Sequence, residues 1–287
     1  MHHDKGSRII SKGKVAIIGG TGLMGRALTR LLKKLNYDVH ICSRTPAKAR
    51  RIAAALKIEA LGFDSIPSMD IVVVSVPVEA TVHVSLKVIP LMRSGSLLVD
   101  VAAVKTPIVE AILKNLPGDL EYLSLHPLFG PQVRRHMGEN LIAVKAKPGP
   151  LSEHLLEDLR VMGLRISEAS PMEHDKLMAA YQALHHYSLL SLALALNRHL
   201  GSQNLTLNPE FYTKSFKLTL KSLARIRRNL ESIMEIQRLN PEAAAARKTL
   251  LQSILDTLEF DKVSEEKMRP IQPNSVRTLV ISNGWIF

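Results

Sequence analysis

The sequence predicts an α/β fold, with a doubly wound parallel sheet in the N-terminal part of the chain and helices alone in the C-terminal part. The chain has 287 residues, of which 46% are hydrophobic, and this is enough for a sizeable core and two domains. Short apolar runs alternate with helix-like stretches up to about Ser170. After Ser170 the strand-like runs stop and long helical patterns continue.

The apolar runs of the N-terminal part are rich in β-branched residues and are expected to be strands. These runs are Val15–Ile18, Val39–Cys42, Ile71–Val76, Leu97–Val101, Tyr122–Leu125 and Leu141–Val144. The stretches that separate or follow them have helical patterns. They are Met24–Leu35, Ala47–Leu56, Glu79–Leu91, Pro107–Asn115 and Leu151–Met162. Strand, helix and strand in succession indicate parallel pairing, with helices on both faces of the sheet.

The helical patterns of the C-terminal part lie near residues 171–200, 209–239 and 241–260. Asn240 and Pro241 are expected to separate the second pattern from the third, because proline ends a helix. We therefore expect domains at residues 8–170 and 171–287. The segment from Asp261 to Phe287 has a mixed pattern, and no fold is assigned to it.

The composition argues against a disulfide-linked, secreted, membrane-spanning or nucleic-acid-binding protein. A single cysteine, Cys42, rules out an intrachain disulfide, and neither a signal peptide nor a membrane-spanning run is expected. We therefore expect a cytoplasmic protein with no membrane partner and no bound metal. The net charge of +12 would suit nucleic acid, but only 4% of residues are aromatic and no nucleic-acid motif is present. A polyanionic substrate and a phosphorylated cofactor explain the charge as well, so no nucleic-acid partner is expected.

Residues 14–25, KVAIIGGTGLMG, place a glycine-rich turn between an apolar run and a helical pattern. Gly20, Gly22 and Gly25 form the pattern GxGxxG. In such a pattern the first glycine allows a tight turn, the second lets the backbone approach a pyrophosphate, and the third allows close packing of helix and strand. We therefore expect a Rossmann-type dinucleotide site, the alternative being a glycine-rich turn that binds nothing.

The residues after the second apolar run indicate which dinucleotide is bound. An acidic residue there would accept a hydrogen bond from the ribose 2′-hydroxyl of NAD, whereas this chain has Ser43, Arg44 and Thr45. A guanidinium can hold a 2′-phosphate by a bidentate contact, so we expect NADP, the alternative being a solvent-exposed arginine. The expected cofactor-binding residues are Gly20, Thr21, Gly22, Leu23, Met24, Gly25, Ser43, Arg44, Thr45, Lys48, Val76 and Pro77.

His126 lies in the stretch YLSLHPLFGP, after an apolar run and before Pro127. An apolar run that ends in proline and glycine is expected to be a buried strand leading into a loop, where α/β enzymes carry their chemistry. The stretch by itself does not distinguish a catalytic histidine from a hydrogen-bonded core histidine.

Three segments together resemble the prephenate dehydrogenase family, which includes arogenate and cyclohexadienyl dehydrogenases. The segments are DVAAVK (100–105), SLHPLFGP (124–131) and EHDKLMAAYQALHHY (173–187). The resemblance runs from the glycine-rich turn to about Ile226. It implies an oxidoreductase of tyrosine biosynthesis that converts prephenate to 4-hydroxyphenylpyruvate, with loss of CO2 and hydride transfer to NADP.

The resemblance also implies roles for individual residues. His126 matches the base that takes the proton of the reacting hydroxyl, which suits an imidazole. Arg225 matches an arginine that holds a substrate carboxylate. The remaining expected substrate-binding residues are His186, Lys217, Lys105, Gln132 and His174. The numerous apolar helices after Ser170, together with the resemblance, imply a homodimer through an all-helical C-terminal dimerisation domain.

Ala103 departs from the family pattern D-x-x-S-V-K, which has a serine at this position that helps to orient the histidine and the reacting hydroxyl. Its absence leaves the fold and cofactor class untouched and places the catalytic rate and substrate preference in question. Arogenate is a second possible substrate, although the neutral Gln132 favours prephenate. Two further hypotheses are a different NADP-dependent oxidoreductase of the same architecture, such as a β-hydroxyacid dehydrogenase or imine reductase, and a non-catalytic NADP-binding regulator.

Overall fold

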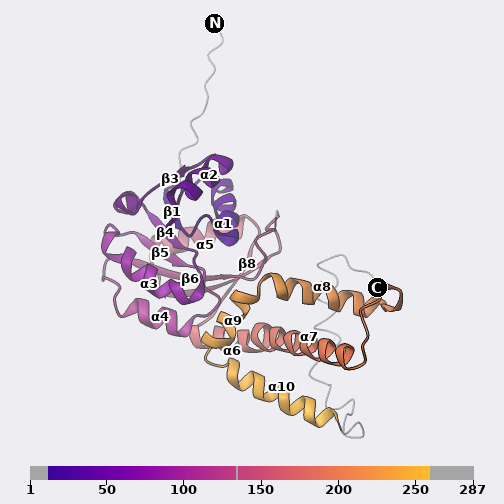
Figure 1. The fold of residues 1–287 in the computed structure, drawn as a ribbon. Helices are drawn as coiled ribbons and strands as arrows, with labels where there is room; N and C mark the ends of the chain where they lie inside the picture. Colours follow the sequence, from indigo (N-terminus) through magenta and orange to yellow (C-terminus); the bar gives the residue numbers. More distant parts are fainter. Residues whose placement is uncertain (1–11, 134, 259–287) are drawn as a thin grey trace. The chain divides into compact units, whose positions relative to one another are not determined.

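The computed structural model describes residues 12–133 and 135–258, which fall into two compact units (Figure 1). One unit contains the chain up to Leu177 together with Met234–Pro241. The other contains Met178–Ile233 and the chain from Glu242 onward. The expected division between residues 170 and 171 lies before helix α6 (Pro171–Met178), most of which belongs to the first unit.

The first unit is built on a sheet of eight strands in the order β3-β2-β1-β4-β5-β6-β7-β8. The strands are β1 (Lys14–Ile18), β2 (Asp38–Cys42), β3 (Glu59–Ala60), β4 (Ile71–Val74), β5 (Leu97–Asp100), β6 (Glu121–Pro127), β7 (Asn140–Lys147) and β8 (Arg165–Glu168). All the expected strands are present. Strands β3 and β8 were not expected, because β3 has only two residues and β8 is largely exposed, so neither forms an apolar run.

Strands β6 and β7 pair antiparallel, whereas the remaining neighbouring strands pair parallel. The expectation of a wholly parallel sheet is therefore wrong at this pair. The physical reason is the connection, because the described residues between the two strands, 128–133 and 135–139, form no helix that could carry the chain back across the sheet.

Helices cover both faces of the sheet, as expected. They are α1 (Leu23–Lys34), α2 (Pro46–Leu56), α3 (Val78–Val88), α4 (Thr106–Leu113) and α5 (Pro150–Val161). Side chains of α1, α2 and α5 share one hydrophobic core with the sheet, in which Leu31 and Leu156 are fully covered. Side chains of α3 and α4, such as Ile112, share a second core with the opposite face. Val73 and Val74 of β4 point into different cores, as the alternation of a strand requires.

The second unit is helical. A π-helical segment, Ala179–Leu184, leads into α7 (His185–Ser202), and α8 (Lys214–Arg228), α9 (Leu230–Leu239) and α10 (Ala243–Thr257) follow. The residues of α9 from Met234 onward belong to the first unit. The expected break at Asn240 and Pro241 is confirmed. The expected helix at 209–239 is instead divided at Asn229, whose side-chain amide donates to the carbonyl of Arg225 at 3.0 Å. None of the helices in the described residues is long and apolar enough to cross a membrane.

Candidate active site

The glycine-rich turn joins β1 to α1 and is shaped by close backbone contacts. Gly19 has a φ of +81°, and a Cβ there would lie 2.2 Å from the carbonyl oxygen of Ser75. The tight-turn role expected for Gly20 therefore falls to Gly19, which was not among the expected residues. A Cβ on Gly25 would lie 2.6 Å from the carbonyl oxygen of Gly19, so glycine at this position allows α1 to pack closely against the turn.

Gly22 is the N-cap of α1 and is exposed, and the nearest atom to a Cβ on it would be 3.2 Å away. The surface beside it therefore remains open to a ligand. The unpaired N–H groups of the first helical turn and the helix dipole favour an anion at this point. A pyrophosphate fits this turn by geometry and by charge.

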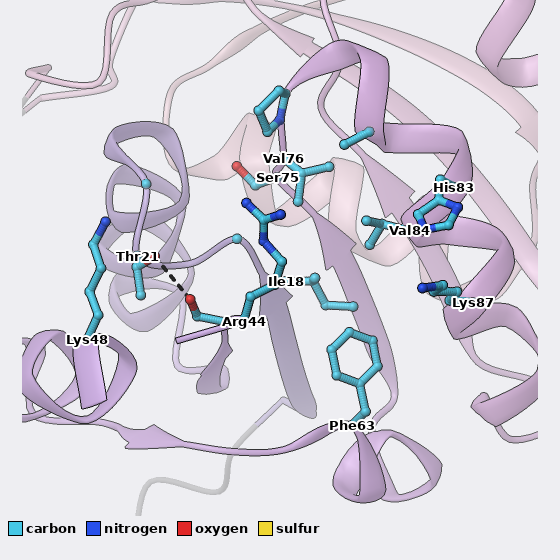
Figure 2. Close-up of a pocket in the computed structure, with 15 residues that line it drawn as sticks. Ile18, Thr21, Arg44, Lys48, Phe63, Ser75, Val76, His83, Val84 and Lys87 are labelled. Carbon is cyan, nitrogen blue, oxygen red and sulfur yellow. Dashed lines mark hydrogen bonds between the residues drawn. The ribbon is translucent and has the colours of Figure 1, made fainter. Parts of the chain in front are cut away.

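A cavity of about 930 Å³ opens beside the turn (Figure 2). The expected cofactor residues that line it are Thr21, Gly22, Ser43, Arg44, Lys48, Val76 and Pro77. Gly20, Leu23, Met24, Gly25 and Thr45 do not line it. The hydroxyl oxygens of Thr21 and Ser43 lie 3.4 Å apart and join the turn to the end of β2.

Phe63, His83 and Lys87 also line this cavity and were not expected. Phe63 lies in a short 3-10 turn after β3, and His83 and Lys87 are four residues apart on α3, so no contiguous motif contains them. Figure 2 shows Arg44 between Lys48 on one side and His83 with Lys87 on the other. The lining has several cationic side chains and no carboxylate, which fits a dinucleotide that carries several phosphates.

His126 lies within β6, one residue before its end, and is only 4% exposed. It faces Ile142 of β7 across the antiparallel pair. The strand thus extends beyond Leu125, where it was expected to end. Because β1, β4, β5 and β6 run parallel, His126 lies at the same carboxyl edge of the sheet as the glycine-rich turn and the cavity.

A chain of buried hydrogen bonds holds His126. Its Nδ1 lies 2.9 Å from Nε2 of His174, and Nδ1 of His174 lies 2.8 Å from Oδ1 of Asp175. The Asp175 carboxylate also accepts hydrogen bonds from the backbone N–H groups of Lys105, at 2.9 Å, and Thr106, at 2.7 Å. Asp175 therefore fixes the histidine chain to the N-terminus of α4.

This series of hydrogen bonds determines which ring nitrogens of His126 and His174 carry protons. A carboxylate only accepts, so Nδ1 of His174 donates to Asp175. In a neutral His174 the Nε2 atom then accepts, and His126 donates to it from Nδ1. The Nε2 atom of His126 is left with its lone pair. This is the form that a general base requires.

The surroundings keep both histidines neutral. Burial lowers the pKa of His126 well below its ordinary value, and the neighbouring Lys105 and His174 act in the same direction, because a charge on either would repel a protonated His126. Burial also lowers the pKa of His174, although Asp175 acts in the opposite direction. At neutral pH the pair therefore has the proton arrangement deduced from the hydrogen bonds.

Lys105 is fully buried beneath His126 rather than exposed to a ligand. Its Nζ donates to the carbonyl of Leu125 at 2.7 Å and to Asp100 at 3.3 Å. Asp100 also accepts from the N–H of Ala102 at 2.9 Å and from the hydroxyl of Tyr122 at 2.8 Å. This arrangement argues against the expected role of Lys105 as a substrate anchor and favours an electrostatic role.

The second unit contains His186, Arg225 and Lys217. Burial, together with the charges of His185 and Arg225, lowers the pKa of His186 to about 4. The influence of Arg225 indicates that His186 and Arg225 share one neighbourhood within this unit. Arg225 and Lys217 are exposed on α8 and are eight residues apart, so they lie near one face of the helix.

The comparisons with known proteins point to one family. Residues 28–138 match the family model described as prephenate dehydrogenase, nucleotide-binding domain. The expected resemblance to prephenate dehydrogenases is confirmed. A probable arogenate/prephenate dehydrogenase of Methanocaldococcus jannaschii is 24% identical over 86% of this chain and 56% of its own length. The T-protein of Haemophilus influenzae is 28% identical over 86% of this chain and 62% of its own length.

A 4-amino-4-deoxyprephenate dehydrogenase of Streptomyces pristinaespiralis is 28% identical over 83% of this chain and 81% of its own length. The chain spans between 52% and 62% of the first three curated relatives it matches.

Solved structures of this family share the fold. Prephenate dehydrogenase from A. aeolicus, in complex with hydroxyphenyl propionate and NAD+, has a TM-score of 0.73 at 17% identity and covers 96% of this chain and 100% of its own. Synechocystis arogenate dehydrogenase has a TM-score of 0.70 at 19% identity and covers 92% of this chain and 99% of its own. The expected α/β class with a helical C-terminal region is thereby confirmed.

Proposed function

We propose that this chain is a prephenate dehydrogenase, which oxidises and decarboxylates prephenate to 4-hydroxyphenylpyruvate with NADP as the hydride acceptor. The observation that carries the proposal is the His126–His174–Asp175 chain, which leaves a ring lone pair at the sheet edge that also carries the nucleotide cavity. The relationship to prephenate and arogenate dehydrogenases supports this choice of reaction.

His126 acts as the general base in this proposal. Its Nε2 takes the proton of the substrate hydroxyl as the carbinol carbon becomes a carbonyl carbon. A bound nicotinamide dinucleotide supplies the hydride acceptor. Loss of CO2 leaves its electron pair in the ring, which becomes aromatic, and His126 returns the proton to the oxygen. The low pKa of His126 suits both transfers, because the imidazole is unprotonated before the reaction and holds the proton only briefly.

Arg44 and Lys48 are proposed to bind the 2′-phosphate of NADP. Both residues line the cavity at the end of β2, and no carboxylate in the lining could accept a hydrogen bond from the 2′-hydroxyl of NAD. The guanidinium of Arg44 offers bidentate contacts, and Lys48 adds a point charge.

The two carboxylates of prephenate need cationic partners. We assign Arg225 to one of them, with Lys217 as an additional cation and the neutral ring of His186 as a hydrogen-bond partner, because Arg225 and His186 influence each other in the second unit. His174 acts through His126 in this proposal rather than by touching substrate. Within the first unit, Gln132 lines a cavity separate from the nucleotide cavity and Lys105 lies in the core, so neither is assigned to a carboxylate.

The chain is further proposed to be a cytoplasmic homodimer. Large apolar side chains of the second unit are exposed, and a second copy could cover them. They include Tyr181, Leu194, Leu205, Phe211, Leu218 and Leu251. Light scattering at micromolar concentration tests this, and a monomer would contradict it.

A turnover assay with prephenate and arogenate, each against NADP and NAD, tests the function. We expect NADPH formation from prephenate, and a strongly reduced kcat with little change in KM for His126→Asn. Turnover of arogenate alone would assign the second substrate. NADP binding without turnover of either substrate would refute the enzyme and favour a regulator.

A further inference from the structure

A second cavity of about 770 Å³ lies in the first unit. It shares no lining residue with the cavity beside the glycine-rich turn, which is called the cofactor cavity below. Its walls come from α1 and from the loop that follows β6. Helix α1 contributes Arg26, Arg30 and Lys34, and the loop contributes Gln132 and His136. The remaining lining residues are apolar. The cavity therefore has several cationic groups and no carboxylate.

The cations of α1 are spaced by four residues, so they lie on one face of the helix. Like charges at this spacing repel one another. Among the residues that the structure describes, no carboxylate forms an ion pair with Arg26 or Arg30. An anion in the cavity would relieve this repulsion.

The contacts that the two arginines make leave most of their donors available. Nε of Arg26 donates to the carbonyl of Gly22 at 3.4 Å, and Nη2 of Arg30 donates to the carbonyl of Pro131 at 3.4 Å. Both distances are at the long end for hydrogen bonds. A guanidinium carries five N–H donors, so each arginine retains donors for a ligand.

His136 lines the cavity on the loop side, opposite the cations of α1. Its ring is 5% exposed and packs edge-on against Phe129, with centroids 5.2 Å apart. Burial lowers the pKa of His136, and the charges of Lys34 and Arg30 lower it further. His136 therefore lies close to the cations of α1, and the loop wall that faces them carries no negative charge.

We propose that this cavity binds a small multivalent anion carrying carboxylate or phosphate groups, with Arg26 and Arg30 as its principal ligands. Such a ligand would bridge α1 and the loop residues Pro131–Val133 and His136, because Arg30 already contacts the carbonyl of Pro131. The loop continues the strand that ends beside His126. The site is separate from the proposed 2′-phosphate site and does not depend on the proposed reaction.

Isothermal titration calorimetry with citrate and with inorganic phosphate, at constant ionic strength and without substrate, tests the proposal. We expect at least one probe to bind, and Arg30→Gln and Arg26→Gln each to raise its Kd about tenfold or more, because each removes charge-assisted contacts. Arg50→Gln removes one positive charge from the exposed surface of α2, outside both cavities, and should change Kd less than about twofold.

The cofactor cavity is a competing site for the same probes, and Arg44→Ala distinguishes it. Binding that Arg44→Ala weakens and Arg30→Gln does not would place the anion in the cofactor cavity and overturn the proposal. Absence of binding for both probes at millimolar concentration would also overturn it. Binding of citrate alone or phosphate alone would identify the class of ligand. None of these results depends on turnover, so the proposed reaction can fail or hold independently.

Discussion

Replacing His174 by leucine should reduce kcat without abolishing the fold, because His174 provides the acceptor for Nδ1–H of His126. The bond spans 2.9 Å and is buried. With leucine present, a proton on Nδ1 of His126 would have no partner, at a cost of about 1–3 kcal/mol. The ring avoids that cost by moving the proton to Nε2, where it blocks the base. Each 1.36 kcal/mol is tenfold in rate, so kcat should fall about 5- to 160-fold.

His174→Gln is the matched variant, because the side-chain oxygen of glutamine can accept from Nδ1–H of His126 although its link to Asp175 is lost. It should retain most of kcat. Both variants should leave KM for prephenate within about twofold, since His174 acts through His126. His199→Leu, at an exposed position on α7, controls for the loss of an imidazole.

Steady-state kinetics, with circular dichroism and thermal unfolding to confirm the fold, provides the measurement. Equal loss of kcat in the leucine and glutamine variants would show that kcat depends on the shape of the His174 side chain and not on its acceptor for Nδ1–H of His126. An unchanged kcat in both variants would refute the tautomer argument.

Further predictions concern the neighbouring groups. Arg44→Ala should weaken NADP binding about 10- to 100-fold and leave NAD nearly unchanged, and equal losses by fluorescence titration would contradict the 2′-phosphate assignment. Lys105→Met leaves the Asp100 carboxylate buried without its cation and should cost about 3–5 kcal/mol of unfolding free energy by urea titration, so a cost below about 1 kcal/mol would be inconsistent. His126 must be unprotonated and its pKa is depressed, so kcat/KM should fall only as pH drops below about 6.5, and a midpoint above that value would count against it as the base. Ala103→Ser should raise kcat by no more than about 13-fold, whereas activity that appears only with serine would make the hydroxyl essential.

The sequence predicted the parts of the fold that depend on local pattern. Apolar runs such as Ile71–Val76 and the GxGxxG turn correspond to β4 and to the β1–α1 junction. Strand β8 could not be predicted, because it is largely exposed and its sequence, RISE, contains no apolar run. The π-helical segment Ala179–Leu184 could not be predicted either, because the sequence has no periodicity that distinguishes it from an α-helix.

Site residues could be predicted where a single sequence motif contains them. Arg44 lies in the cofactor cavity, as the end of the second apolar run indicated. Phe63 and Lys87 line the same cavity but come from separate turns and helices, so only the packed sheet brings them together. Lys105 was expected as an anchor or an electrostatic neighbour of substrate or cofactor, and its pairing with Asp100 in the core favours the second role. The burial of this pair depends on the packed sheet and is not visible in the sequence.

The pairing of His174 with His126 gives a physical reason why alanine at position 103 is compatible with the proposed activity. A base needs a partner that fixes its tautomer and orientation, and a serine hydroxyl is one such partner. In this chain the partner is a buried imidazole, which is held in turn by Asp175. Asp175 itself is fixed by two backbone N–H groups at the start of α4, so the orientation depends on the packing of α6 against α4 within the first unit. The serine hydroxyl could therefore add a further contact to the reacting oxygen, while the alignment of His126 is already provided by the protein core.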